Sequence, residues 1–325
     1  MINNAENNDM VVKINSKTVW KFLFFAMSAI LIYTQIFGIV ITPLAALGKK
    51  ISGTNAGTGA KISASTDGSK VQDDAADLKA VVLPASGISL PIKWGDLGKQ
   101  LVDLGAIDSQ KFESIYTGNI LTEAKNLLSG QNNNSIVMTS KNSGLLLNLL
   151  WAFGLANKNS ILEKGPMQDS QYGGAANFAS TGGWTLAKGS AMSHYSKHQL
   201  VKLTSAQQAL VEKVSKNIYR PCCNNSTYFP DCNHGMAMLG LIELMAARNV
   251  SEQDMYSAAL KVNSFWFPNN YLTIAKYFQE QGFEWESIDP GTLLGSEYSS
   301  SAGFKLISAN TEPISGGSGG GGCGV

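Results

Sequence analysis

The stretch Leu145-Leu-Leu-Asn-Leu-Leu-Trp-Ala-Phe153 decides the fold class, because it is apolar on nearly every side. A helix at a protein surface carries one apolar stripe, whereas a helix that is apolar all round lies inside a core. Ser143 precedes the stretch and can begin the helix. We therefore predict a buried central helix, against which the rest of the chain packs.

From Trp94 onward, helical patterns also dominate the sequence around this stretch. Apolar residues recur at helical spacing, and Thr204-Ser-Ala-Gln207 is a capping box. The predicted helices cover 96–104, 109–116, 122–128, 204–219, 235–248, a segment capped at 251, and 271–281. Two short pieces punctuated by proline, 81–84 and 88–92, are predicted as edge strands or irregular structure, and the polar run 131–135 is predicted as a loop. The predicted fold class is mainly α, an irregular helical bundle domain over residues 77–311 with a few short extended segments.

A single N-terminal transmembrane helix is predicted ahead of this domain. Residues 1–21 are a short tail, and residues 22–48 contain no charged side chain. About 20 apolar residues cross a bilayer, and the apolar core of a secretory signal is shorter, at roughly 7–15 residues. A cleaved signal and a buried core helix are the alternatives. Residues 49–76 are rich in Gly, Ser and Thr, which is typical of a flexible linker.

Three lysines precede the predicted span (Lys13, Lys17, Lys21) and three follow it (Lys49, Lys50, Lys61), so the positive-inside rule gives no orientation. A short tail followed by one span and a large domain favours a single-pass membrane protein whose domain is extracytoplasmic. The chain has 25 basic and 24 acidic residues, and this balance argues against a nucleic-acid partner.

Three of the four cysteines and all three histidines lie between residues 192 and 238. Four of them have the spacing Cys-Cys-x8-Cys-x-His, namely Cys222, Cys223, Cys232 and His234. Thiolate and imidazole ligands select zinc, copper(I) or iron–sulfur clusters over calcium or magnesium. We predict that these residues bind a transition metal ion, zinc or copper. If their segment is helical, His194 and His198 lie on one face and serve as auxiliary ligands.

Cys232 precedes the predicted helix at 235–248, with Asp231 or Asn233 as the expected cap. A thiol beside a helix N-terminus has a lowered pKa, because the free N–H groups there stabilise its anion. The remaining cysteine, Cys323, lies in a Gly-rich tail over residues 312–325 that is predicted to be disordered. This cysteine is incidental, forms an intermolecular bridge, or is a mobile thiol that reaches the cysteine loop.

The cysteine loop also resembles the CDGSH iron–sulfur motif over about a dozen residues. Cys223-x2-Ser226-x3-Pro230-x-Cys232 follows that motif. Asn233 stands in place of its aspartate, and Met236 stands in place of its histidine. The resemblance implies a 2Fe–2S cluster, a cofactor that cysteine and histidine can hold together.

The sequence thus predicts a membrane-anchored domain that binds a soft transition metal for capture, sensing or transfer. The main alternative is an extracytoplasmic structural or interaction protein, in which Cys222 or Cys223 pairs with Cys232 in a disulfide that pins the loop. A thiol-dependent enzyme that uses Cys232 with a histidine is a further alternative, as is an iron–sulfur protein. No motif identifies a substrate or a protein partner.

Overall fold

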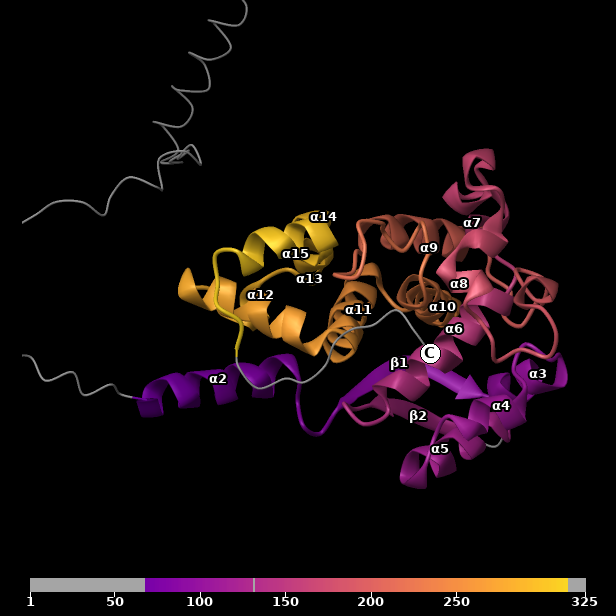
Figure 1. Ribbon diagram of the computed structural model, residues 1–325, viewed down its shortest axis with the longest axis horizontal. Coiled ribbons are helices and arrows are strands. Elements are labelled where there is room, and N and C mark those ends of the chain that lie inside the picture. Colours follow the sequence, from indigo (N-terminus) through magenta and orange to yellow (C-terminus); the bar gives the residue numbers. More distant parts are fainter. Residues whose placement is uncertain (1–67, 131, 315–325) are drawn as a thin grey trace, which may run out of the picture. The chain divides into compact units, whose positions relative to one another are not determined.

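Helices α6 (Ser143–Ala156) and α10 (Asn233–Ala247) form the centre of the fold (Figure 1). The computed structural model describes residues 68–130 and 132–314. Between Leu145 and Ala156 every residue except Leu147 is buried, as the sequence predicts for a central helix. Helix α10 is buried along its length from Asn233 to Ala246 and packs against α6. The mainly helical class is therefore confirmed.

Besides α6 and α10, the described residues form further helices and two strands. The helices are α2 Gly68–Val82, α3 Leu97–Asp103, α4 Ser109–Ser114, α5 Gly118–Leu128, α7 Ser160–Lys164, α8 Ala179–Gly182, α9 Ser205–Asn217, α11 Glu252–Trp266, α12 Pro268–Glu280, α13 Pro290–Leu294, α14 Ser296–Ser299 and α15 Ser301–Ser308. Short 3₁₀ turns lie at Pro166–Gln168, Ser170–Tyr172, Ala175–Asn177, Ala191–Ser193 and Trp285–Ser287. The strands are β1 Ile88–Gly95 and β2 Asn132–Met138.

Three predicted caps are present as hydrogen bonds. Thr204 and Gln207 form the capping box of α9. Asp108 accepts from two backbone N–H groups at the start of α4, and Ser251 accepts from Asp254 at the start of α11. These caps are local interactions between residues two or three apart, so the sequence predicts them well.

The strands form an antiparallel pair, with Ile88 opposite Met138 and Lys93 opposite Ser135. Leu90, Ile92 and Trp94 alternate toward the core. The register shifts between Ser89 and Lys93, around Pro91, because proline has no N–H to donate to a ladder.

Two parts of the predicted organisation are corrected. Helix α2 includes residues 68–76, which the composition predicts to be part of a flexible linker, and Val81 and Val82, which the proline pattern predicts to be extended. Leu78 and Val82 are four residues apart and both buried, so they form the inner face of this helix. The polar run at 132–135 is the beginning of β2, not a loop. Its pairing with β1 overrides the low strand propensity of asparagine.

No helix within 68–130 or 132–314 combines the length and the apolar character that a bilayer crossing needs. The predicted membrane span at 22–48 lies outside the described residues, and so does most of the Gly-rich tail, including Cys323. Both remain predictions.

Two glycines allow the backbones of α6 and α10 to approach closely. A Cβ atom at Gly154 would lie 2.2 Å from the Met236 carbonyl oxygen, and one at Gly240 would lie 2.6 Å from the Leu150 carbonyl oxygen. Both contacts are with backbone, so no side chain can rotate away to relieve them. The central packing therefore requires glycine at these positions.

We expect Gly154→Ala to lower the free energy of unfolding by about 2 kcal/mol, because overpacking a core costs more than the helix propensity that alanine adds. Gly144 supplies a matched control in the same helix, since a Cβ atom there meets nothing within 4 Å. Gly144→Ala should be neutral or stabilising by about 0.5–1 kcal/mol. Urea unfolding of both variants checks this, and equal effects would contradict the close approach of the two helices.

Candidate metal centre

The candidate site lies in the loop that connects α9 to α10. Other parts of the chain hold this loop by its backbone. Ser301 N–H, at the start of α15, donates to the Cys223 carbonyl at 2.9 Å. Ser180 N–H, in α8, donates to the Asp231 carbonyl at 3.1 Å. The loop is thus fixed from two sides by elements that lie far from it in the sequence.

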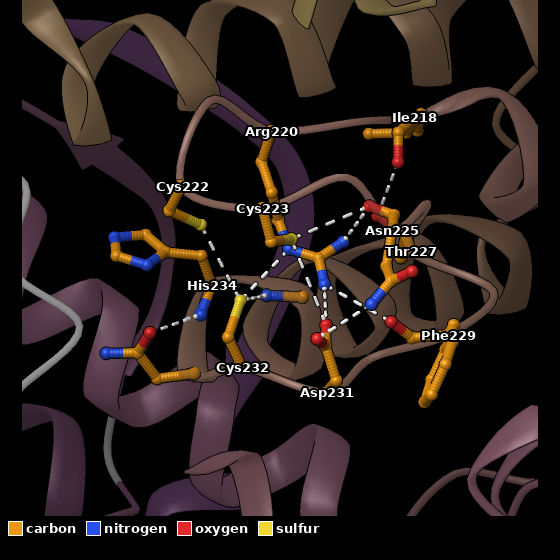
Figure 2. Close-up of polar contacts among 12 residues, drawn as sticks. Ile218, Arg220, Cys222, Cys223, Asn225, Thr227, Phe229, Asp231, Cys232 and His234 are labelled. Carbon is orange, nitrogen blue, oxygen red and sulfur yellow. Dashed lines mark hydrogen bonds and ion pairs between the residues drawn. The ribbon is translucent and has the colours of Figure 1, made fainter. Parts of the chain in front are cut away.

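Arg220 is the centre of the loop (Figure 2). Its guanidinium Nε donates to Cys232 Sγ at 3.0 Å, and Nη2 donates to Asp231 Oδ1 at 2.6 Å. Nη1 donates to the Asn225 carbonyl at 2.9 Å, and Nη2 also donates to the Phe229 carbonyl at 3.2 Å. The side chain is only 1% exposed. A buried charge needs such pairing, so this one residue ties four parts of the loop together.

Gly235, in the first turn of α10, makes room for the guanidinium. A Cβ atom at this position would lie 2.5 Å from Arg220 Nη2 and 2.6 Å from Cζ. Arg220 therefore lies against the N-terminal end of α10, where the helix dipole disfavours a cation. The negative charges of Asp231 and of a Cys232 thiolate offset this cost.

Cys232 itself is the N-cap of α10, whereas the sequence pointed to Asp231 or Asn233. Its Sγ accepts from Gly235 N–H at 3.4 Å. The thiol is 6% exposed. With the Arg220 Nε–H, two donors thus point at one buried sulfur, and this arrangement stabilises a thiolate.

Cys222 and His234 complete a group around this sulfur. Cys222 Sγ lies 3.7 Å from Cys232 Sγ, and the ligand atoms of Cys222, Cys232 and His234 all lie within 4.8 Å of one another. The His234 ring packs at 4.4 Å from the Phe267 ring, measured between centroids. Its Nδ1 is buried and has no hydrogen-bond partner among the described residues. Buried polar atoms are rarely left unpaired, so this nitrogen suits a ligand.

Cys223 belongs to a different group, which contains Cys223, Asp231 and Cys232. Cys223 Sγ lies 3.8 Å from the Asn225 carbonyl oxygen and 3.9 Å from Asp231 Oδ1. Arg220 donates to two members of this group, Asp231 and Cys232. Arg220 thus already neutralises the Asp231 carboxylate of this second group. The group with His234 instead contains a buried nitrogen without a hydrogen-bond partner among the described residues, and it is better suited to an added ion.

The three thiols have different pKa values. Hydrogen bonding from Cys222 and then from Cys223 lowers the pKa of Cys232 well below its usual range, and the Arg220 charge adds to this effect. Interaction with the Cys223 and Cys232 thiols, followed by burial, raises the pKa of Cys222. For Cys223, the interaction with Cys222 lowers the pKa, but Cys232 and burial outweigh it and raise the value to about 11. In the favoured charge state of the three cysteines, Cys232 is therefore a thiolate and Cys222 and Cys223 are thiols.

All three cysteines in the described part of the chain are free thiols. In this state the loop is held by Arg220 and by backbone hydrogen bonds, and the disulfide of the alternative interpretation stays a prediction. The CDGSH resemblance is local, because Cys232 leads directly into a long buried helix.

His194 and His198 contact one another, and neither belongs to a ligand group of the described residues. They do not share a helix, since the 3₁₀ turn ends at Ser193 and Ser196 has a left-handed φ of 52°. His194 Nδ1 nevertheless lies 3.0 Å from His198 Nε2, and His194 Nε2 lies 3.3 Å from the Lys188 carbonyl oxygen. Because a carbonyl only accepts, His194 Nε2 carries the proton and His198 Nε2 donates to His194 Nδ1. Burial, and then the His194 charge, lower the pKa of His198.

Sequence reasoning missed two residues of note. Arg220 is one of only two arginines in the chain and stands directly before Pro221-Cys222, which is a signal that could have been used.

The second residue, Glu243, is the only charged residue of α10 and is completely buried. Burial raises its pKa to about 8, although hydrogen bonding from Asn157 and Asn159 acts against this. It lies more than two helical turns beyond His234 and takes no part in the thiol group.

Comparisons with protein-family models, with curated proteins and with solved structures give no match for this chain.

Proposed function

We propose that this chain is a membrane-anchored domain that binds one soft transition metal ion through Cys222, Cys232 and His234. The observation that carries the proposal is the grouping of two sulfurs and one imidazole within 4.8 Å, together with the unpartnered buried Nδ1 of His234. Two thiolates and one imidazole are ligands that zinc and copper(I) prefer. The membrane anchor rests on the apolar segment at 22–48.

The charges around the group favour zinc over copper(I). Arg220 is paired with Asp231, so two thiolates would leave two negative charges in a largely buried site. A divalent ion neutralises both, whereas copper(I) leaves one uncompensated, and uncompensated buried charge is costly. The donors at Cys232, Arg220 Nε and Gly235 N–H, would orient the sulfur as outer-shell partners do in metal sites.

Three protein ligands leave one position of a tetrahedral ion open, which is the pattern of sites that exchange a ligand or bind a substrate. Metal capture, sensing or transfer near a membrane suits such a site better than a purely structural role. Cys223, in the neighbouring group, offers a further thiol that an exchanging ion could contact.

Metal analysis of the reduced full-length protein, loaded separately with zinc and with copper(I), tests this function. We expect about one zinc per chain, and we expect Cys232→Ser to weaken binding by more than the roughly 10–100-fold effect typical of outer-shell changes. Serine is itself a good N-cap residue, so the variant should keep α10 and its circular dichroism. Cys223→Ser is the matched control and should retain the metal.

Equal metal loss in Cys223→Ser and Cys232→Ser would contradict the assigned ligand set. A wild-type protein that retains neither ion after loading would contradict the function. Stoichiometric iron with a red-brown colour would favour the iron–sulfur alternative instead.

A further inference from the structure

Cys222 and Cys232 form a close but unequal pair of thiols. Their sulfurs lie 3.7 Å apart and must approach by about 1.7 Å to reach the length of a disulfide bond. Cys222 is half-buried, whereas Cys232 is buried. An incoming thiol therefore reaches Cys222 more easily.

The two sulfurs also differ in how well they hold a negative charge. Cys232 Sγ accepts from Arg220 Nε at 3.0 Å and from Gly235 N–H at 3.4 Å, at the N-terminal end of α10. Cys222 Sγ instead lies beside other thiols, with Cys232 Sγ at 3.7 Å. In thiol–disulfide exchange, the sulfur whose anion is better stabilised leaves faster. Cys232 is thus arranged as a leaving group and Cys222 as the sulfur that is attacked.

We propose that the metal-free protein carries out thiol–disulfide exchange through a reversible disulfide between Cys222 and Cys232. This activity goes beyond metal binding and does not depend on it. An external thiolate attacks Cys222 Sγ, the Cys222–Cys232 bond breaks, and its electron pair goes to Cys232 Sγ. A second external thiolate attacks the mixed disulfide and releases Cys222, which takes up a proton. Two external thiols are oxidised to one disulfide, and the protein disulfide is reduced to two thiols.

Cys223 is the competing partner, and its surroundings disfavour it. Its sulfur lies near two oxygen atoms, the Asn225 carbonyl and the Asp231 carboxylate, at 3.8 and 3.9 Å. A carboxylate beside a sulfur disfavours the thiolate needed for exchange.

A bound metal would occupy both Cys222 and Cys232 and protect them from exchange, so the disulfide and the metal exclude each other.

The test uses full-length protein with Cys223→Ser and Cys323→Ser, which leaves Cys222 and Cys232 as its cysteines. After treatment with a chelator, the protein is equilibrated with mixtures of reduced and oxidised glutathione. The reaction is quenched with acid, and the mass of the protein is measured by mass spectrometry. We expect a loss of two hydrogens, about 2 Da, a cross-linked Cys222–Cys232 peptide, and full reversal by excess reduced glutathione, to which ordinary structural disulfides are resistant. Wild-type protein should give the same cross-link, and this arm needs no variant to fold.

Three results would overturn the proposal: thiols that stay reduced across the titration, glutathione adducts without a cross-link, or a wild-type bridge through Cys223. Metal analysis of the reduced protein is read separately. Metal binding without exchange supports the proposed function and contradicts this inference. Exchange without metal binding supports this inference and contradicts the proposed function. If the protein both binds metal and exchanges, the zinc-loaded protein should form the disulfide at least tenfold more slowly than the metal-free protein.

Discussion

Replacing Arg220 by methionine is expected to lower the free energy of unfolding by about 3–5 kcal/mol. Methionine fills similar space but leaves Asp231 and Cys232 without their buried counter-charge, and it removes donors from the carbonyls of Asn225 and Phe229. Removing one partner of a buried ion pair is costly because the other stays buried and unpaired. The measurement is urea unfolding at neutral pH, followed by circular dichroism.

The chain supplies a matched control for this change, because its sequence contains only one other arginine. Arg248 is exposed at the end of α10, and Arg248→Met should change stability by no more than about 0.5 kcal/mol. Arg220→Lys keeps the charge but not the planar fork that reaches four acceptors, so we expect an intermediate loss. Equal stability of Arg220→Met and Arg248→Met would show that the loop does not depend on the guanidinium.

The second large effect is a loss of stability as pH rises through the range in which Glu243 titrates. Burial raises its pKa from 4.5 to about 8 in the folded protein, so the folded state binds more protons than the unfolded state between these values. Stability is therefore fully present below about pH 4.5 and is lost as pH rises toward 8. Since each pKa unit corresponds to about 1.4 kcal/mol, this group should remove on the order of 3 kcal/mol between pH 5 and pH 8.

Glu243→Gln checks this expectation by urea unfolding at a series of pH values. The amide keeps an acceptor for Asn157, which donates to the Glu243 carboxyl, and it does not titrate. Its absolute stability at low pH can differ from that of wild type, so the readout is the slope of stability against pH. A fall of similar steepness in the variant would show that Glu243 is not responsible.

Much of the fold follows from short-range patterns in the sequence. The all-round apolar character of residues 145–153 predicts the central helix, and the caps at Asp108, Thr204 and Ser251 mark real helix starts. Elements that depend on distant partners do not follow from such local patterns. Strand β2 begins with three asparagines and exists because β1 pairs with it, and the inner face of α2 is defined only by what it packs against.

For the candidate site, the sequence by itself determined which residues have ligand chemistry and that they cluster between 192 and 238. Only the tertiary structure decided how they divide. It groups Cys222 and Cys232 with His234, directs Cys223 toward Asp231, and leaves His194 and His198 in contact with each other. The physical reason is Arg220, whose buried guanidinium needs two anions and two carbonyls. Satisfying it fixes the path of the loop, and no spacing of cysteines and histidines along the chain contains that information.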